Sequence, residues 1–197
     1  MASGRKRNFD IDGALEKATL VFWQKGFVGA SMTDLTESMG INKPSLYSTF
    51  GNKEQLFVTA TEHYLAKYAA PHVEMLQQQN LSIKQRLLNY LLSVIEMHCD
   101  VSLPKGCFVS LCAAESASHD MPQSAMDAIL TIQGSHQKLL TDFFKEEKAQ
   151  GNLEKSFDVE ANVNYILSFI HGSAVLARSG KTLDELTQSV HVAVKVW

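Results

Sequence analysis

SMTDLTESMGINKPSLYSTFGNKEQLF, residues 31–57, contains the local signals for two short helices separated by a tight turn. Ser31 can cap a first helix that ends at Gly40, and Asn42 can cap a second helix over residues 43–50. Gly40 allows the positive φ that a sharp turn between the helices requires. This combination predicts a helix-turn-helix, a motif whose second helix lies in the major groove of DNA.

The two predicted helices have an apolar and a polar face. The apolar side chains, which we expect to face inward, are Leu35, Met39, Ile41, Leu46 and Phe50. Most of the outward side chains can donate hydrogen bonds to phosphates or base edges, and the proline among them can contact thymine methyl groups. These outward side chains are Lys43, Pro44, Ser45, Tyr47, Ser48 and Thr49. An ordinary helical hairpin with a polar surface would fit the same pattern.

The stretch also resembles the DNA-binding domain of the TetR/AcrR family of repressors over about residues 8–57. The resemblance is strongest in PSLYSTFGNKEQLF, residues 44–57. It extends to Phe22, Gly26-Phe27, Ser31–Thr33 and Gly40-Ile41. It implies a regulator that binds a palindromic operator and that a small molecule releases. The C-terminal two-thirds resemble the family only in length and number of helices.

The resemblance implies a role for each matching position. Base-edge contacts fall on Lys43, Pro44, Ser45 and Ser48, and phosphate contacts fall on Ser31, Thr33, Tyr47 and Thr49. Lys53 would stand at the N-terminus of the following helix, where its charge and the helix dipole both attract a phosphate. Ser48 and Thr49 stand where family members often carry aromatic or histidine side chains. This difference predicts weaker base readout or a reliance on DNA shape.

The charge of the chain is unevenly distributed. The 197 residues have a net charge of −3, yet residues 1–55 hold seven Lys or Arg against six Asp or Glu. Arg5, Lys6 and Arg7 are adjacent at the start. Such an arm suits minor-groove or phosphate contacts, although a frayed, solvated terminus would have the same composition. We find neither a signal peptide nor a membrane-spanning segment, so we expect a cytoplasmic protein that does not bind membranes.

The rest of the chain has the capped, amphipathic pattern of an all-α protein of about nine helices. Asp10 caps the first helix, which we expect to end at Lys25-Gly26. The helices after the helix-turn-helix cover about residues 53–78 with a kink at Pro71, a segment behind a Ser82–Gln85 capping box, residues 107–118, residues 122–150, a segment behind Asp158 and a segment behind a Thr182–Glu185 capping box. We divide the chain into a helix-turn-helix domain with a basic arm, residues 1–52, and a helical ligand-binding and dimerisation domain, residues 53–197.

The last two predicted helices, about residues 158–179 and 183–197, are apolar on more than one face. The side chains beyond a single stripe include Leu167, Phe169, Val175, Leu176 and Val192. A helix of this kind is usually buried on both sides, so we expect a homodimer interface here, with monomer core as the alternative. Two recognition helices roughly 34–36 Å apart would then match a palindrome.

Aromatic, methionine and histidine side chains on the intervening helices predict a site for an apolar or aromatic small molecule. The candidates are Tyr64, Tyr68, Met97, Phe108, Cys112, His136, Phe143, Tyr165 and Phe169, together with His98 and His171. Each of these would equally suit the core. The resemblance to the TetR/AcrR family implies that ligand binding moves the helix that begins at Lys53 and so changes the spacing of the recognition helices.

The sequence gives weaker support for other functions. A thiol-based sensor of electrophiles or oxidants could use Cys107 or Cys112. The spacing of these residues and of Cys99, His98 and His119 does not favour zinc, and we expect no cofactor. The sequence lacks Gly-x-Ser-x-Gly, a phosphate-binding glycine loop and His-Glu-x-x-His, so we do not expect an enzyme. A helical interaction protein without DNA binding is the remaining alternative.

Overall fold

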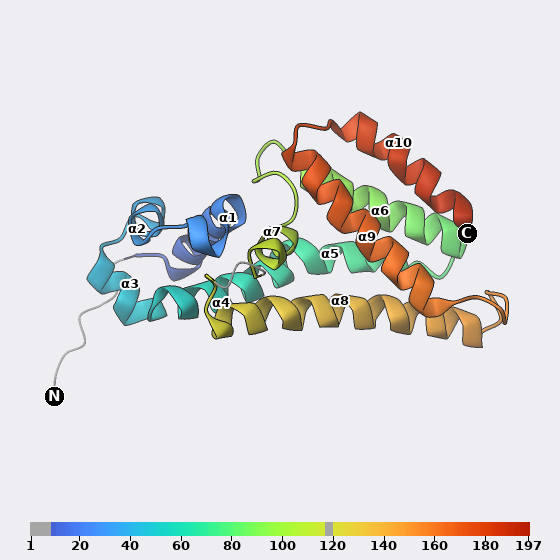
Figure 1. The fold of residues 1–197 in the computed structure, drawn as a ribbon, viewed down its shortest axis with the longest axis horizontal. Coiled ribbons are helices and arrows are strands. Elements are labelled where there is room, and N and C mark those ends of the chain that lie inside the picture. Colours follow the sequence, from blue (N-terminus) through green and yellow to red (C-terminus); the bar gives the residue numbers. More distant parts are fainter. Residues whose placement is uncertain (1–8, 117–119) are drawn as a thin grey trace.

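The computed structural model describes residues 9–116 and 120–197, and every regular element in them is helical. The elements are α1 (Ile11–Gly29), α2 (Met32–Met39), α3 (Lys43–Phe50), α4 (Lys53–Tyr64), α5 (Ala70–Val73), α6 (Ile83–Cys99), α7 (Phe108–Glu115), α8 (Gln123–Ala149), α9 (Val159–Arg178) and α10 (Leu183–Ala193). Helices α1–α3 lie at one end of the molecule, and α6, α9 and α10 lie at the other (Figure 1). The predicted all-α fold is confirmed. The described part has about nine helices, because α4 and α5 belong to one interrupted helical path.

Most helices begin at the capping residues that the sequence indicates. The side chains of Asp10, Ser31, Asn42, Asn52, Asp158 and Thr182 each accept a hydrogen bond from a backbone N–H of the first turn. Each cap satisfies one of the four N–H groups that a helix start leaves unpaired. The predicted box behind Ser82 is only half formed. Gln85 Nε2 donates to Asn89 at 2.9 Å, because a partner four residues on shares its helix face.

Pro71 interrupts the helix that begins at Lys53, as predicted. A proline has no N–H, and its ring clashes with the carbonyl four residues earlier. The chain responds with a π-helical segment over Leu65–Ala69, after which the Ala70 N–H donates to the Leu65 carbonyl. The path continues through α5 and a 3₁₀ turn to Gln77. The connection from α3 to the C-terminal helices is therefore helical but not straight.

Several predicted helix ends differ from the structure, and the largest differences concern α1 and α7. Helix α1 does not stop at Gly26: this glycine has φ 74° and ψ −177°, and one more turn follows to Gly29. The helix predicted over residues 107–118 begins one residue later, because Cys107 is its N-cap. Ser118 lies outside the described residues.

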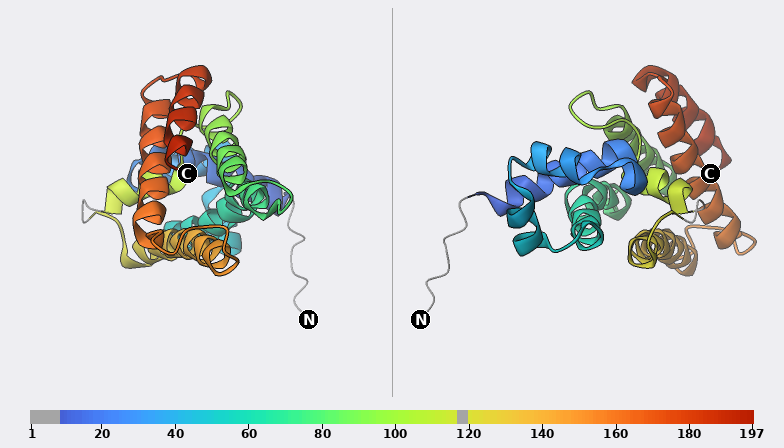
Figure 2. Two further views of the ribbon diagram at one scale, coloured as in Figure 1. Left: turned by 90° about the vertical axis from the view of Figure 1, so that its right-hand side faces the viewer. Right: turned by 60° about the vertical axis from the view of Figure 1, so that its left-hand side comes forward.

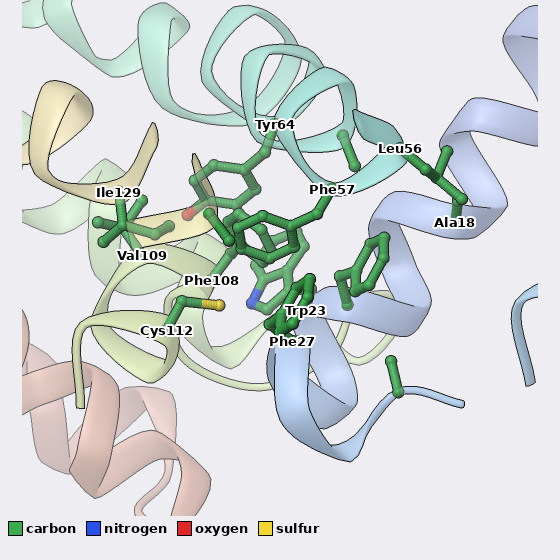
Figure 3. Close-up of a cluster of buried hydrophobic side chains, with 14 of the residues drawn as sticks. Ala18, Trp23, Phe27, Leu56, Phe57, Tyr64, Phe108, Val109, Cys112 and Ile129 are labelled. Atoms are coloured by element: carbon green, nitrogen blue, oxygen red, sulfur yellow. The ribbon is translucent and has the colours of Figure 1, made fainter. Parts of the chain in front are cut away.

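Buried side chains form two clusters. The first joins α1–α4 to α7 and the start of α8, around the rings of Phe22, Trp23, Phe57, Tyr64 and Phe108 (Figure 3). The second lies among α6, α8, α9 and α10, which pack together at the end of the molecule opposite α3 (Figure 2). Helix α1, which packs against α2, thus rests directly on α7, and α4 packs against α8. Within the described ranges, no helix has the length and apolar character needed to cross a bilayer.

Candidate DNA interface and effector core

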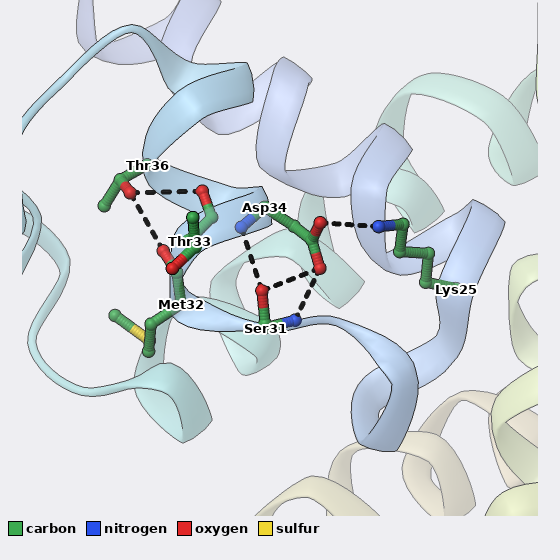
Figure 4. Close-up of polar contacts among 6 residues, drawn as sticks. All are labelled: Lys25, Ser31, Met32, Thr33, Asp34 and Thr36. Atoms are coloured by element: carbon green, nitrogen blue, oxygen red, sulfur yellow. Dashed lines mark hydrogen bonds and ion pairs between the residues drawn. The ribbon is translucent and has the colours of Figure 1, made fainter.

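The start of α2 is fixed by a reciprocal set of polar contacts (Figure 4). Ser31 Oγ accepts from the Asp34 N–H at 3.0 Å, and Asp34 Oδ2 accepts from the Ser31 N–H at 2.9 Å. Lys25 Nζ, on α1, lies 2.5 Å from Asp34 Oδ1. The hydrogen bonds from Lys25 and Ser31 lower the pKa of Asp34 well below its usual value. These contacts hold α2 to α1 before the turn at Gly40.

Helix α3 is placed for recognition by its cap and by one buried side chain. Asn42 Oδ1 accepts from the Ser45 N–H at 2.9 Å, and Pro44 occupies the first turn, where its missing N–H loses no bond. Leu46 is fully buried and holds the inner face of α3. The left-handed Gly40, at φ 69° and ψ 30°, turns the chain from α2 into this helix. The predicted helix-turn-helix geometry is therefore present.

The predicted DNA-contact side chains of α3 lie on its outer face. Lys43, Pro44, Tyr47 and Ser48 are exposed, and Ser45 and Thr49 are partly exposed. Tyr47 is the most prominent of them, with 52% of its surface accessible despite its aromatic ring. Exposed aromatic rings next to hydroxyl and ammonium donors suit contacts to phosphates and bases.

The other predicted DNA contacts fall in three places. Ser31 and Thr33 are exposed at the start of α2. Arg5, Lys6 and Arg7 lie outside the described residues. Lys53 is turned toward the protein: its Nζ lies 4.4 Å from the centre of the Phe27 ring. Burial lowers the pKa of Lys53, and the nearby Glu115 partly opposes this effect.

The structure divides the predicted ligand residues between the two clusters. Tyr64, Phe108 and Cys112 are fully buried in the first cluster, and Tyr68 and Met97 pack against it. Phe143 and Phe169 border the second cluster. Tyr165 stays apart from the rest, with its ring 5.6 Å from that of Trp197 near the C-terminus. The candidates are therefore spread over both clusters.

Sequence reasoning missed a polar region inside the C-terminal part. Buried or half-buried histidines there pair with hydroxyl groups on other turns and helices. These pairs are His72 with Ser93 at 3.0 Å, Tyr90 with His136 at 2.6 Å, His98 with Ser173 at 3.2 Å and Ser110 with His171 at 2.7 Å. The predicted residues His98, His136 and His171 are among them. Single serines within apolar helix stripes carry no recognisable sequence signal, so their partners could not be foreseen.

His98 is the member of this region with an unused polar atom. Ser173 Oγ donates to the Ile170 carbonyl at 2.8 Å, so the same oxygen accepts from the Nδ1–H of His98. The Nε2 atom is then left as an acceptor, and it is buried without a hydrogen-bond partner among the described residues. Burial lowers the pKa of His98 to about 3 and that of His136 to about 4. Both side chains are therefore neutral at physiological pH.

The three cysteines differ in environment. Cys112 is fully buried, and burial raises the pKa of its thiol far above the ordinary value. Cys107 Sγ lies 3.5 Å from the Tyr64 hydroxyl at the start of α7. Cys99 is partly exposed, and burial raises the pKa of its thiol. No group of three metal-binding side chains occurs within residues 9–116 and 120–197, and His119 lies outside them.

Two open grooves flank a buried ion pair at the end of the molecule far from α3. Arg86 Nη1 lies 2.6 Å from Glu147 Oε1, and Arg86 Nε donates to the Leu76 carbonyl at 2.6 Å. Asn152 donates to the other carboxylate oxygen. Of the predicted ligand residues, only Phe143 lines either groove. Because the ion pair is fully hydrogen-bonded, we assign it a structural role.

Comparisons with known proteins agree with this geometry. The family model "Bacterial regulatory proteins, tetR family" matches residues 14–60, and the model "Tetracyclin repressor-like, C-terminal domain" matches residues 84–191. The chain is similar to the HTH-type transcriptional repressor ComR of Escherichia coli K12, with 31% identity over 98% of this chain and 91% of that protein. It is 29% identical to the uncharacterized HTH-type transcriptional regulator YezE of Bacillus subtilis, over 98% of both chains.

A solved structure gives the same result in three dimensions. The transcriptional regulator CifR, as a cysteine mutant complexed with 26-bp double-strand operator DNA, superposes with a TM-score of 0.88. Its identity to this chain is 31%, and the match covers 98% of this chain and 100% of that chain. The similarity includes both the helix-turn-helix and the C-terminal helices.

Proposed function

The chain belongs to the tetR family of bacterial regulatory proteins, and we propose that it is a transcriptional repressor that a small molecule releases from a palindromic operator. As a family member it is a DNA-binding transcriptional regulator. The exposed face of α3 carries the proposal, because it presents Lys43, Tyr47 and Ser48 to solvent in a helix-turn-helix. CifR, a cysteine mutant of which has the same fold, forms a complex with 26-bp operator DNA. We propose that it acts in the cytoplasm, where operator DNA is found, and we propose no catalytic activity for it.

We propose that α9 and α10 form the homodimer interface. Apolar side chains remain exposed along their outer faces, and a monomer would leave them in water. They are Val175 at 59%, Leu176 at 44%, Leu183 at 40% and Val192 at 63% exposure. Several exposed apolar side chains on two helices that contact each other indicate an interface. A dimer would also present two copies of α3 to the two halves of a palindrome.

We propose that the effector binds in the polar region around His98. The neutral Nε2 of His98 is an acceptor without a partner among the described residues, and the neighbouring Met97 packs against the cluster that holds the rings of Tyr64 and Phe108. An aromatic molecule with one hydroxyl or amide donor would match both features. A panel of phenols and anilides, tested by thermal shift, should contain compounds that stabilise the wild type. The stabilisation should be lost in His98→Leu but kept in a variant of the exposed His191.

A thiol sensor is the second candidate function. The observation in its favour is the position of Cys107 at the first turn of α7, with Sγ next to a tyrosine hydroxyl. Treatment with N-ethylmaleimide would then release DNA from the wild type but not from Cys107→Ser. Equal release from both proteins would remove this candidate. Cys112, which is fully buried, serves as the control position.

Selection of bound duplexes from fragmented genomic DNA tests the main proposal. We expect a palindromic site, and Tyr47→Ala should weaken binding to it by about tenfold without changing thermal stability, because the ring is exposed. Thr131→Ala, on the exposed surface of α8, is the control and should leave binding unchanged. Failure of the wild type to bind any fragment at low salt would overturn the proposal.

A further inference from the structure

The break in α1 is built around groups from the C-terminal part of the chain. Gly26 has φ 74°, a conformation that side-chain-bearing residues rarely adopt. A Cβ at this position would lie 2.1 Å from Glu115 Oε1. The carboxylate of Glu115, at the end of α7, therefore occupies the space that the break opens beside the helix.

Glu115 binds the backbone that follows the break. The Phe27 N–H donates to Glu115 Oε2 at 2.7 Å, across 88 residues of sequence. The N–H groups of Val28 and Gly29 also interact with this carboxylate. Unpaired N–H groups at the start of a helical turn attract negative charge, and here α7 supplies it.

Arg178 binds the backbone that precedes the break. At the end of α9, its guanidinium donates to the Trp23 carbonyl and, at 3.5 Å, to the Gln24 carbonyl. The Trp23 ring is held as well, because its Nε1 donates to the Gly106 carbonyl at 3.1 Å. Carbonyl groups at the end of a helical segment attract positive charge, so the sign of Arg178 also matches its site.

The same segment of α1 also contacts the start of α2 in the helix-turn-helix and the start of α4. Lys25 pairs with Asp34 at the start of α2, and Lys53 at the start of α4 lies over the Phe27 ring. In Figure 3 the rings of Trp23 and Phe27 point from α1 toward Cys112 and Phe108 on α7. A displacement of α7 or α9 would move this segment of α1. It would therefore change the Lys25–Asp34 contact at the start of α2 and the Lys53–Phe27 contact just after α3.

We propose that Gly26, Glu115 and Arg178 form a joint through which α7 and α9 set the position of the recognition helix. Glu115 and Arg178 are its positioning residues, and neither contacts DNA. This inference rests on the proposed function, and it adds a route through α1 to the movement of α4 expected from the sequence. In this structure the joint pairs the backbone groups on both sides of the break. An effector that separates α7 from α9 would leave either the N–H groups bound by Glu115 or the carbonyls bound by Arg178 without their partner.

The test compares selected and scrambled DNA. The duplex selected by the wild-type protein and a scrambled duplex of equal length are titrated with Arg178→Met and Glu115→Ala. If the joint positions α3, the ratio of the two affinities should fall by about tenfold, which is a typical coupling between two sites. Partial unfolding would weaken both complexes equally and would leave the ratio unchanged. Arg86→Met removes an arginine that also donates to a backbone carbonyl but lies far from the joint, and it should keep the wild-type ratio.

Conservative variants keep the test decisive if Arg178→Met or Glu115→Ala does not fold. Glu115→Gln retains an acceptor and should lower the ratio less than Glu115→Ala does. Arg178→Lys cannot reach two carbonyls with a planar fork and should lower the ratio by about threefold, whereas Arg86→Lys should not. Folded variants with the wild-type ratio would overturn the joint alone. A wild type that does not prefer any duplex would overturn the proposed function, and the joint with it.

Discussion

Gly26 and Gly40 both have a positive φ, but for different reasons. A Cβ at Gly40 would stand in open space, so only the left-handed backbone opposes a side chain there. At Gly26 the backbone is at φ 74° and ψ −177°, and the Glu115 carboxylate fills the space as well. One glycine serves a local turn, and the other serves a contact between distant segments.

We predict different costs for alanine at these two positions. Gly40→Ala should lower the free energy of unfolding by about 1–2 kcal/mol, the typical cost of a left-handed non-glycine residue. Gly26→Ala should lower it by about 3 kcal/mol or more, because the conformation is available almost only to glycine and the Cβ meets the carboxylate. Urea denaturation measures both values. Equal losses would show that Glu115 moves aside freely.

Lys53 shows how a residue can match a motif and still have a second role. Its position in the family motif implies a phosphate contact, whereas its ammonium lies over the Phe27 ring in this structure. The cation–π contact depends on α1 packing against the start of α4. Motif matching identifies the residue, but it does not give the direction of its side chain.

The Glu16 carboxylate on α1 forms polar contacts with α4 and with the π-helical segment that follows it. Glu16 on α1 lies 2.6 Å from His63 Nε2 and 2.8 Å from Lys67 Nζ, and it accepts a hydrogen bond from the Tyr68 hydroxyl. Burial alone would raise the pKa of Glu16, but the hydrogen bonds from Lys67, Tyr68 and His63 together lower it. This contact ties α1 to the π-helical segment that precedes Pro71.

We predict a pH-dependent loss of stability for Glu16→Gln. The folded-state pKa is below the unfolded value of 4.5, so the contribution is present above that value and disappears as the pH falls through the folded pKa. At pH 7 the variant should lose up to about 1 kcal/mol, since the group is only partly buried and solvent screens it. The difference from wild type should shrink below pH 4. Glu62→Gln, exposed on α4, should show no such trend.

At the scale of the whole molecule, the buried histidines make the C-terminal part sensitive to acid. The pKa of His98 is about 3 and that of His136 about 4 in the folded state, against 6.5 for the free side chain. Because the unfolded chain binds more protons below pH 6.5, stability is complete above that pH and is lost as the pH falls toward the folded values.

We predict that His98→Gln reduces this sensitivity. Each such histidine contributes up to about 1.4 kcal/mol of lost stability per pH unit between these limits. Urea unfolding at pH 7 and pH 5 should therefore show a smaller decrease for His98→Gln than for the wild type. A substitution at His191, which is exposed on α10, should leave the decrease unchanged. The same decrease in all three proteins would contradict the buried, neutral state of His98.

We predict that charges on the outer faces of α9 and α10 prevent dimerisation. Val175→Glu combined with Val192→Glu places charges on both exposed apolar faces and should convert the dimer to a monomer. Light scattering measures the mass, and operator affinity should fall with it. Val101→Glu is the matched control, because Val101 is 93% exposed but lies in the loop before α7. A double variant that remains dimeric would place the interface elsewhere.

The sequence alone determined which residues cap the starts of most helices. It also identified the helix-turn-helix, because caps, left-handed glycines and apolar periodicity act over three or four residues. Only the tertiary structure decided which distant groups meet. Glu115 reaches the Phe27 N–H across 88 residues, and Arg178 reaches the Trp23 carbonyl across 155. Such contacts depend on how whole helices pack. This is why the turn of α1 that follows Gly26, the direction of Lys53 and the hydroxyl partners of the histidines had no local signal.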